Sequence, residues 1–370
     1  MKPIITALIG NGKSANRYQL PYILQRKDKY TVKTIYQRDL SVFKWKKIED
    51  IQYTDDLDAM LMDPEIELII VTLPSHLQCK YTKRIMKAGK HCVVEKPFTE
   101  TRAQAEELFK LAHDKGLMVQ CYQNRRFDSD LLTAQKVIKS GALGDLQEME
   151  LTFDYDRPEV PLSSTNFSRI HSYYYGHACH SLDQVISMFG KPNRIVYDVR
   201  QLLGSGRLND YFDVDMFYQN LKVSVKSSFF RVVPRPSLTL YGSNGMFIKT
   251  KKDKQEEHLK QFLWPNWDGF GKDEPEEYGI LTIRDENGQA QASSVETVTG
   301  DYGRYYDALY QTLRYNEPKL VQDEHTLWQL AYLEEGIKAL NYKTQKLSNS
   351  SRVLVINTFI KMTAFLSDNQ

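Results

Sequence analysis

The sequence predicts an α/β protein in which an N-terminal, doubly wound parallel sheet precedes a C-terminal α+β domain with a large, mostly antiparallel sheet. Three observations carry this prediction. Short apolar segments alternate with helical segments in the first third of the chain, a glycine-rich turn directly follows the first of them, and alternating polarity replaces this pattern further on. Strand–helix alternation is typical of parallel sheets covered by helices, and period-two polarity indicates antiparallel strands with one exposed face.

The apolar segments of the first third are short enough to be strands that are buried on both faces of a sheet. Helical segments separate several of them, and one of these helices has Thr101 as its N-cap. The predicted strands span residues 4–9, 30–36, 68–72, 91–95 and 118–122, and the helices span residues 78–88 and 101–115. This alternation predicts a first domain over residues 1–125.

A different pattern begins at residue 126, where strands follow one another with turns between them. The predicted elements are a linking helix at residues 130–140, strands at residues 146–155, 213–218 and 222–226, and hairpin turns at residues 243–245 and 287–288. Residues 126–370 are therefore expected to form the α+β domain, with helices on one face of its sheet. The other face either meets solvent or forms the interface of a homodimer or higher homo-oligomer.

Charge and composition limit the class of partner. The 370 residues carry a net charge of +2, and 41% of them are hydrophobic. Lysine-rich stretches at residues 43–47 and 249–254 could form a nucleic-acid patch, but acidic residues nearly balance the basic ones, which favours solvated surfaces. We expect a small-molecule substrate and no nucleic-acid partner.

The sequence also predicts a cytoplasmic protein without a membrane partner. No apolar run approaches the ~20 residues of a membrane span, and the apolar N-terminal segment is too short for a signal peptide. The four cysteines are scattered and form no C-x-x-C pair, as expected for free thiols in a reducing compartment. No metal site is expected.

The turn after the first strand carries the pattern G-x-G-x-x-A. Gly10 permits a tight turn, Gly12 lets the backbone approach a pyrophosphate, and Ala15 lets the helix pack closely on the strand. The following helix, with Lys13 at its start, offers free N–H groups and a positive dipole end to phosphates. A chance glycine-rich turn is the alternative, but the strand–turn–helix context favours a dinucleotide site.

The end of the second strand predicts which dinucleotide binds there. An acidic residue at this place bonds the ribose of NAD, whereas an arginine accommodates the 2′-phosphate of NADP. Gln37 stands where the acid is expected, and Arg38 follows it. NADP is therefore favoured over NAD. The alternatives are that Asp39 reaches the ribose, or that Arg38 is only a surface residue.

A lysine at the end of the fourth main strand is the strongest catalytic candidate. Lys96 stands between Glu95 and Pro97 at the carboxyl edge of the sheet, where doubly wound proteins bind ligands. A lysine there can hydrogen-bond the reacting oxygen and take the proton that an alcohol loses on oxidation. Alternatively, it is a surface lysine beside a turn proline.

These motifs together resemble the glucose–fructose oxidoreductase / inositol dehydrogenase / MocA family (Gfo/Idh/MocA), over nearly the whole chain. The resemblance rests on the glycine turn Gly10 to Ala15, the loop Thr72-Leu73-Pro74-Ser75-His76, the segment Ala88 to Pro97 with its Glu95-Lys96-Pro97, the pair Arg126-Phe127, the turn Gly141 to Gly144 and the H-x-x-D motif His180-Ser181-Leu182-Asp183. It implies an N-terminal Rossmann domain and NAD(P)-dependent hydride transfer to or from a hydroxyl or carbonyl carbon of a sugar, inositol or sugar acid.

The resemblance also implies roles for single residues. Lys96 would transfer the proton, and His180 would be the second acid/base group, although a lone helix histidine is more often structural. Asp183 would orient His180 or bind substrate, and Arg126 and Arg157 are further substrate-contact candidates. Besides the glycine turn, Gln37 and Arg38, the cofactor residues would be Thr72, Pro74, His76, Glu95 and Lys96.

Two departures from the family pattern leave an alternative open. Sugar and inositol dehydrogenases of the family have an Asp four residues before the histidine, where this chain has Gly176, and a frequent family His appears as Gln78. The resembled dehydrogenases use a Lys, an Asp and a His at this site. Unless His177 or Asp183 compensates for the missing Asp, only Lys96 and His180 of this set remain. The alternative is therefore a dinucleotide-binding regulator or sensor without turnover.

Overall fold

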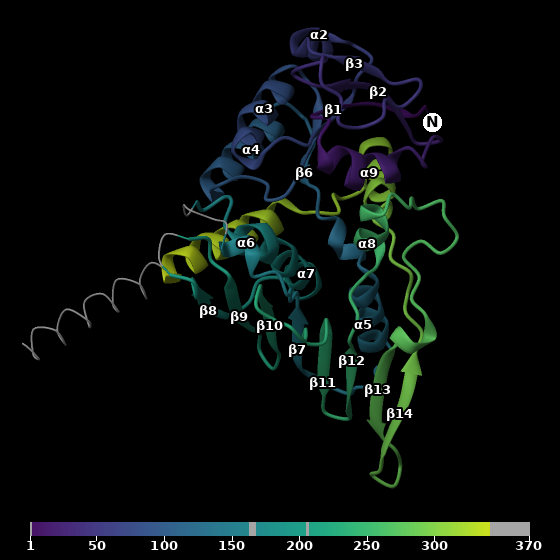
Figure 1. Cartoon of the computed structure of the whole chain (residues 1–370), viewed down its shortest axis with the longest axis vertical. Coiled ribbons are helices and arrows are strands. Elements are labelled where there is room, and N and C mark those ends of the chain that lie inside the picture. The colour runs from purple at the N-terminus through teal and green to yellow at the C-terminus, as the bar shows by residue number, and fades with distance from the viewer. Residues whose placement is uncertain (1, 163–167, 205–206, 341–370) are drawn as a thin grey trace, which may run out of the picture.

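The computed structural model describes residues 2–162, 168–204 and 207–340, so the remainder of the predicted second domain lies outside the described residues. Two sheets lie at opposite ends of the molecule, with helices on and between them (Figure 1). One is a parallel sheet of six strands and the other a mostly antiparallel sheet of eight. The predicted α/β architecture is confirmed.

The N-terminal sheet has the strand order β3-β2-β1-β4-β5-β6, and all its pairings are parallel. Its strands are β1 (Ile4–Ile9), β2 (Tyr30–Tyr36), β3 (Gln52–Thr54), β4 (Leu68–Val71), β5 (His91–Val94) and β6 (Val119–Cys121). The accompanying helices are the π-helical turn η1 (Ala15–Gln19), α1 (Leu20–Ile23), α2 (Leu57–Met62), α3 (Ser75–Lys87) and α4 (Arg102–Asp114). This order reverses direction between β1 and β4, which is where Rossmann folds bind dinucleotides.

The structure adds to the predicted elements in the first domain. Strand β3 and helix α2 were not predicted, because a three-residue polar strand and a six-residue helix carry too little periodicity to be recognised. Helix α3 starts at Ser75, three residues earlier than expected, with Pro74 in the N-cap position. Thr101 caps α4 as predicted, with its side chain accepting a hydrogen bond from the Gln104 N–H at 3.2 Å.

The second sheet has the order β14-β13-β12-β11-β7-β10-β9-β8 and is antiparallel except between β7 and β10. Its strands are β7 (Leu146–Thr152), β8 (Arg194–Arg200), β9 (Tyr211–Phe217), β10 (Lys222–Ser228), β11 (Leu238–Gly242), β12 (Gly245–Lys249), β13 (Gly279–Arg284) and β14 (Ala290–Val295). The helical elements are η2 (Asn124–Phe127), α5 (Ser129–Lys139), α6 (Glu159–Leu162), η3 (Tyr174–Ala178), α7 (Cys179–Phe189), α8 (Gln255–Lys260), η4 (Pro275–Glu277), α9 (Arg304–Tyr315) and a last helix described over residues 323–340.

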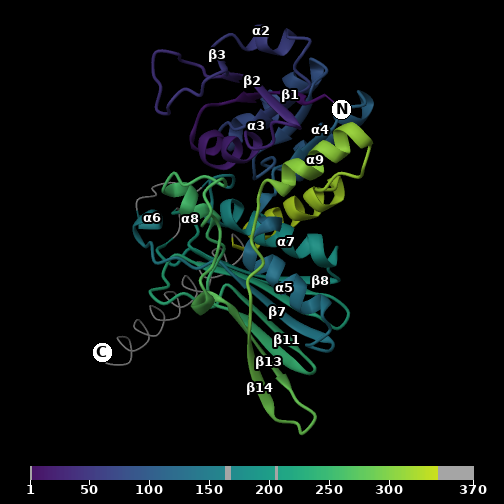
Figure 2. The same ribbon diagram turned by 90° about the vertical axis from the view of Figure 1, so that its right-hand side faces the viewer.

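Both predicted hairpin turns connect neighbouring strands, β11 to β12 and β13 to β14. Helices α5 and α7 cover the face of the sheet that points toward the parallel-sheet domain (Figure 2). Strand β9 shows the expected alternation, since Phe212, Val214 and Met216 are fully buried and the residues between them are partly exposed.

Helix α9 connects the two halves, because it lies late in the chain but packs on the N-terminal domain. The Tyr30 hydroxyl donates to the Tyr306 carbonyl at 2.6 Å, and Arg26 pairs with Asp307 at 2.9 Å. Arg314 pairs with Glu67 at 2.7 Å. These contacts fix the orientation of the two sheets and therefore the shape of the space between them.

Among the described residues, no helix is long and apolar enough to cross a membrane, and no His, Cys, Asp and Glu side chains gather in groups of three that could hold a metal ion. All four cysteines are free, and three of them are buried.

Candidate active site

The glycine turn after β1 is shaped by a contact with the end of β4. Gly10 has φ +107°, and a Cβ at this position would lie 2.8 Å from Thr72 Oγ1, so only glycine fits. The Thr72 hydroxyl donates to the Ile9 and Gly10 carbonyls at 3.0 Å each. A Cβ on Gly12, in contrast, would meet nothing within 4 Å. The backbone beside Gly12 is thus open, as a pyrophosphate requires.

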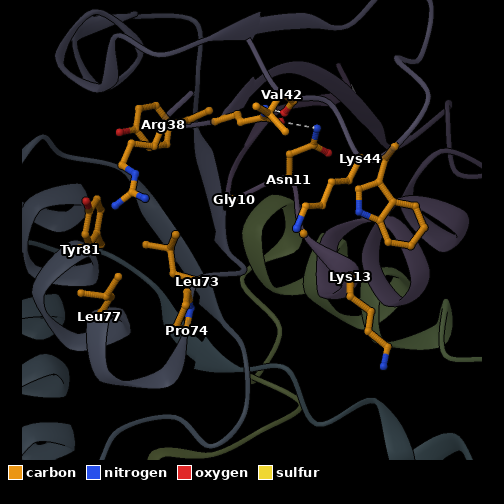
Figure 3. Close-up of a pocket in the computed structure, with 14 residues that line it drawn as sticks. Gly10, Asn11, Lys13, Arg38, Val42, Lys44, Leu73, Pro74, Leu77 and Tyr81 are labelled. Carbon is orange, nitrogen blue, oxygen red and sulfur yellow. Dashed lines mark hydrogen bonds between the residues drawn. The ribbon is translucent and has the colours of Figure 1, made fainter. Parts of the chain in front are cut away.

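A cavity of about 630 Å³ lies next to this turn (Figure 3). Its lining residues are Gly10, Asn11, Gly12, Lys13, Tyr36, Gln37, Arg38, Val42, Lys44, Trp45, Leu73, Pro74, Leu77 and Tyr81. The structure therefore brings together six of the predicted cofactor residues: Gly10, Gly12, Lys13, Gln37, Arg38 and Pro74. Sequence reasoning missed Lys44 and Trp45 in particular, because they lie on a loop whose course no periodic pattern indicates.

The other predicted cofactor residues lie elsewhere. Ala15 is fully buried at the start of η1, where it packs as predicted, and Thr72 uses its hydroxyl to hold the glycine turn. His76 lies outside this cavity, with its ring centroid 6.0 Å from that of His171. Glu95 and Lys96 line a second, smaller cavity.

The segment after β2 keeps the predicted register. Gln37 Oε1 accepts a hydrogen bond from Asn11 Nδ2 at 2.8 Å, and Gln37 Nε2 donates to the Asp39 and Val42 carbonyls. The Asp39 carboxylate turns to the hydroxyl and N–H of Ser41, which lower its pKa, and Asp39 does not line the cavity. An acid is therefore absent from the place where NAD-binding folds hold the ribose.

The second cavity, of about 80 Å³, lies between the two domains. Its lining residues are Tyr18, Glu95, Lys96, Tyr122, Asn124, Arg125, His180, Glu256 and Tyr302. Lys96, two residues after the end of β5, and His180, on α7, thus come together here, although their motifs lie 84 positions apart. Tyr18, Arg125 and Glu256 were not predicted, since they carry no motif of their own.

Glu95 connects the two cavities. Its carboxylate accepts hydrogen bonds from the Ser14 hydroxyl and from Gln19 Nε2, the latter at 2.6 Å. Ser14 belongs to the glycine turn, and Gln19 is the last residue of η1. The Lys96 N–H donates to the same carboxylate at 3.2 Å. Glu95 therefore positions Lys96 relative to the helix that begins at the cavity of about 630 Å³ beside the glycine turn.

Lys96 also contacts the segment that carries the histidines. Its Nζ donates to the Gly176 carbonyl at 3.4 Å, within the π-helical turn η3 that leads into α7. Gly176 is the residue that replaces the family Asp, and its backbone carbonyl accepts from the lysine instead. A π-helical turn is an uncommon structure that is often found at functional sites.

Both histidines of this segment are neutral at pH 7. Burial lowers the pKa of His177 to about 3, and the nearby positive charges of Lys96 and Arg125 lower it further. Burial and the same two cations, together with His177, hold the pKa of His180 well below its ordinary value. The buried His180 Nδ1 has no hydrogen-bond partner among the described residues. A neutral imidazole with a free nitrogen can accept or relay a proton.

Arg126 and Asp183 form a buried ion pair with each other instead of lining the cavity. Arg126 Nε and Nη2 each donate to one Asp183 carboxylate oxygen at 2.7 Å, and Nη1 donates to the Leu320 carbonyl at 2.6 Å. We expected both residues to contact substrate, or Asp183 to orient His180. In this geometry they bind each other instead. The neighbouring Arg125 lines the cavity, because consecutive residues of the short turn η2 point in different directions.

Arg157 also differs from expectation. Its side chain is 56% exposed and pairs with Glu159 at 3.4 Å, outside both cavities.

The neutral state of His177 predicts a dependence of stability on pH. The unfolded chain takes up the proton near pH 6.5 and the folded protein only near pH 3, so the free energy of unfolding falls as the pH falls through this range. The loss attributable to His177 should be about 1.4 kcal/mol per pH unit. Between pH 6.5 and 5, wild type should lose about 2 kcal/mol relative to His177→Phe, measured by denaturant unfolding.

Phenylalanine suits this comparison because His177 lies among aromatic rings, with the Tyr173 centroid at 4.3 Å and the Tyr155 centroid at 5.4 Å. Identical pH profiles of the two proteins would show that His177 titrates normally.

Comparison with known proteins agrees with the fold and the glycine turn. The pattern described as "Oxidoreductase family, NAD-binding Rossmann fold" matches residues 4–123, and "Oxidoreductase family, C-terminal alpha/beta domain" matches residues 135–347. The uncharacterized oxidoreductase YhhX of Escherichia coli (strain K12) is 41% identical over 92% of this chain and 98% of YhhX. The scyllo-inositol 2-dehydrogenase (NADP(+)) IolW of Bacillus subtilis (strain 168) is 31% identical over 84% of this chain and 86% of IolW.

Solved structures agree as well. The crystal structure of the probable oxidoreductase yhhX has a TM-score of 0.85 and covers 90% of this chain and 96% of that chain. An oxidoreductase from Bacillus cereus, 38% identical, has a TM-score of 0.83 and covers 90% of this chain and 95% of that chain. The chain therefore belongs to the Gfo/Idh/MocA family and is an NAD(P)-dependent oxidoreductase.

Proposed function

We propose that this protein transfers a hydride reversibly between NADP and a hydroxyl or carbonyl carbon of a small polyhydroxylated compound: a sugar, an inositol or a sugar acid. The observation that carries the proposal is the meeting of Lys96 and His180, from different domains, in one cavity beside the dinucleotide cavity. The name of the relative IolW, an NADP-dependent inositol dehydrogenase, supports the same substrate class.

The residues at the glycine turn fit a dinucleotide. Gly12 leaves open space beside the backbone, and Lys13, Arg38 and Lys44 bring positive charge to the cavity wall. A bound nicotinamide dinucleotide would supply the hydride donor or acceptor. The cavity has no carboxylate among its lining residues that would repel a 2′-phosphate.

Lys96 and His180 would handle the proton that accompanies the hydride. The Lys96 ammonium can donate a hydrogen bond to the reacting oxygen, while Glu95 and the Gly176 carbonyl keep the lysine in place. His180 is neutral and lines the same cavity, and its buried Nδ1 has no hydrogen-bond partner among the described residues. The imidazole can therefore accept the proton from a substrate hydroxyl and return it in the reverse direction.

If the protein prefers NADP, two cations of the same cavity, Arg38 and Lys44, should contribute differently to the affinities for NADP and NAD. Figure 3 shows Arg38 on the side of Tyr81 and Leu77, and Lys44 on the opposite side, near Asn11. Arg38 follows Gln37 directly and is the group placed to grip a 2′-phosphate. Arg38→Ala should therefore weaken NADP binding by roughly 10- to 100-fold and NAD binding by much less, measured by calorimetric titration of both dinucleotides.

Lys44→Ala is the matched control, because it removes a cation from the other side of the cavity. It should change the affinities for NADP and NAD by similar factors. If wild type binds NAD more tightly than NADP, the assignment of Arg38 is wrong.

Turnover itself is tested with a screen of sugars, inositols and sugar acids, in which the absorbance of the reduced nicotinamide is followed. We expect turnover with at least one member of these classes. Tight dinucleotide binding without turnover on any of them would instead favour the regulator that the loss of the family Asp at Gly176 suggests.

We further propose a cytoplasmic homo-oligomer that assembles through the outer face of the eight-stranded sheet. The strand register places Tyr241, Met246 and Thr282 in one row on that face and Ile248 beside Ile280. Tyr241 and Ile280 are 40% and 44% exposed, so an apolar patch is available for a partner copy. Light scattering on the purified protein gives the mass that tests this assembly. The four free cysteines support a reducing compartment.

A further inference from the structure

Lys252 is a half-buried lysine that no motif singles out. It lies between β12 and α8, and its Nζ donates to the Asp154 carbonyl at 2.8 Å. The same nitrogen lies 4.1 Å from the ring centroid of Phe153 and 4.7 Å from that of Tyr155. Its surroundings are therefore largely aromatic, with one carbonyl as the polar contact.

No described carboxylate forms an ion pair with this ammonium, although Asp154, Asp130 and Glu256 lie near enough to raise its pKa. Asp154 is itself bound by Arg235 through two hydrogen bonds of 2.8 Å. Lys252 itself forms no ion pair with any described residue, in contrast to Lys249, which pairs with Asp273. Burial lowers the pKa of Lys252 to about 8, so the group is still mostly charged at pH 7. A desolvated cation without a direct ion pair favours an incoming anion.

The lysine adjoins the candidate active site through two aromatic rings. Phe153 contacts Lys252 and also the guanidinium of Arg125, which lies 4.8 Å from its ring centroid and lines the cavity of Lys96 and His180. The ring of Tyr155 contacts Lys252 and lies 5.4 Å from that of His177. One aromatic ring, that of Phe153, thus separates Lys252 from Arg125, and another, that of Tyr155, separates it from His177.

The other cations of this region are less available to an anion. Arg125 is held by Glu256 and, at 3.4 Å, by Asp128. Lys96 is the group that the hydride-transfer proposal assigns to the reacting oxygen. Lys252 adjoins the site without an ion pair among the described residues, so it is available to a charged group elsewhere on the substrate.

We propose that Lys252 binds an anionic group, a carboxylate or a phosphate, on the polyhydroxylated substrate, with Phe153 and Tyr155 forming the apolar wall of this subsite. The inference rests on the proposed function, and it narrows the substrate from neutral sugars and inositols to their acidic derivatives. Aromatic rings beside a charged group are typical of sites that stack on the C–H face of a sugar ring while a cation fixes its acid.

The test compares ligands that differ only in charge. Methyl glycosides of glucose, of glucuronic acid and of glucose 6-phosphate, with their galacto and manno counterparts, are titrated calorimetrically into protein saturated with NADPH. We expect at least one anionic glycoside to bind roughly 10- to 100-fold more tightly than its neutral counterpart, the usual effect of a charge-assisted hydrogen bond. Comparing the glucuronic acid glycosides with the glucose 6-phosphate glycosides shows whether the subsite prefers a carboxylate or a phosphate.

Variants at position 252 connect this preference to the lysine. Lys252→Gln should abolish the preference, and Lys252→Arg should keep most of it, while NADP affinity at the distant dinucleotide cavity reports that both variants are folded. Lys251→Gln, the exposed neighbour, is the matched control and should behave as wild type. Equal binding of neutral and anionic glycosides, or a preference that survives in Lys252→Gln, would overturn the inference.

These measurements detect binding and need no turnover. A failure of the proposed hydride transfer would appear in the absorbance screen and leave the glycoside affinities unchanged, so the two proposals fail separately.

Discussion

Lys96→Ala should lower kcat by roughly 10²- to 10⁴-fold, the usual contribution of general acid–base catalysis, once a substrate is identified. The lysine lies in the same cavity as His180, and two contacts hold it there: its N–H donates to the Glu95 carboxylate, and its Nζ donates to the Gly176 carbonyl. Its removal takes away the hydrogen bond to the reacting oxygen, which strengthens as charge develops in the transition state. Steady-state kinetics with NADP at saturation measure the effect.

The affinity for NADP should change little in the same variant, because the residues that line the dinucleotide cavity do not include Lys96. Lys110→Ala, on the exposed face of α4, is the control for an unspecific effect of losing a lysine. Full activity of Lys96→Ala would remove the lysine from the mechanism and transfer the proton work to His180.

Local sequence patterns predicted the parallel sheet except β3, and in the second sheet they predicted β7, β9 and β10 but not β8. The signals that succeeded lie within a few residues of each other. The turn Gly10 to Ala15 follows β1 directly, and the alternation in β9 is visible without any knowledge of its neighbours. Both hairpin turns were recognisable from the same kind of local signal. Such patterns reflect backbone conformation and burial, which the chain specifies locally.

The contacts of individual charged side chains could not be predicted in this way. Arg125 and Arg126 are adjacent in sequence, yet one lines the cavity and the other pairs with Asp183. Lys44 lies on a loop, and the surroundings of Lys252 are formed by rings that follow β7, about 100 positions away in the sequence. These roles depend on tertiary packing, and no periodicity in the sequence encodes them.

The loss of the family Asp at Gly176 illustrates how backbone can replace a side chain. A Cβ at Gly176 would meet nothing within 4 Å, so the fold does not require glycine there for space. The Gly176 carbonyl accepts a hydrogen bond from Lys96. An Asp at position 176 would be expected to attract the same lysine with its carboxylate. The carbonyl orients the lysine without adding a further negative charge beside Glu95 and Glu256, which already line this cavity.

The buried pair of Arg126 and Asp183 should be a sensitive point of the fold. Both side chains are buried, at 8% and 2% exposure, and two hydrogen bonds of 2.7 Å join them. Removing one partner leaves the other as an uncompensated buried charge, which typically costs about 3–5 kcal/mol. Asp183→Leu and Arg126→Met should each lower the free energy of unfolding by about this amount, a large fraction of the about 5–15 kcal/mol of a typical domain.

The double variant Arg126→Met/Asp183→Leu should recover most of the loss, because apolar residues of similar volume often replace a buried ion pair at little cost. Denaturant unfolding of the four proteins gives the coupling energy of the pair. Arg102→Ala is the matched control: its pair with Glu106 is 48% exposed at both side chains, and an exposed pair should contribute less than about 1 kcal/mol.

If Asp183 instead contacts substrate, as its place in the H-x-x-D motif first suggested, Asp183→Asn should raise KM and leave the unfolding free energy near that of wild type. A large loss of stability with an unchanged KM assigns Asp183 to the fold, where its two bonds to Arg126 hold α7, and with it His180, against the η2 turn that carries Arg125.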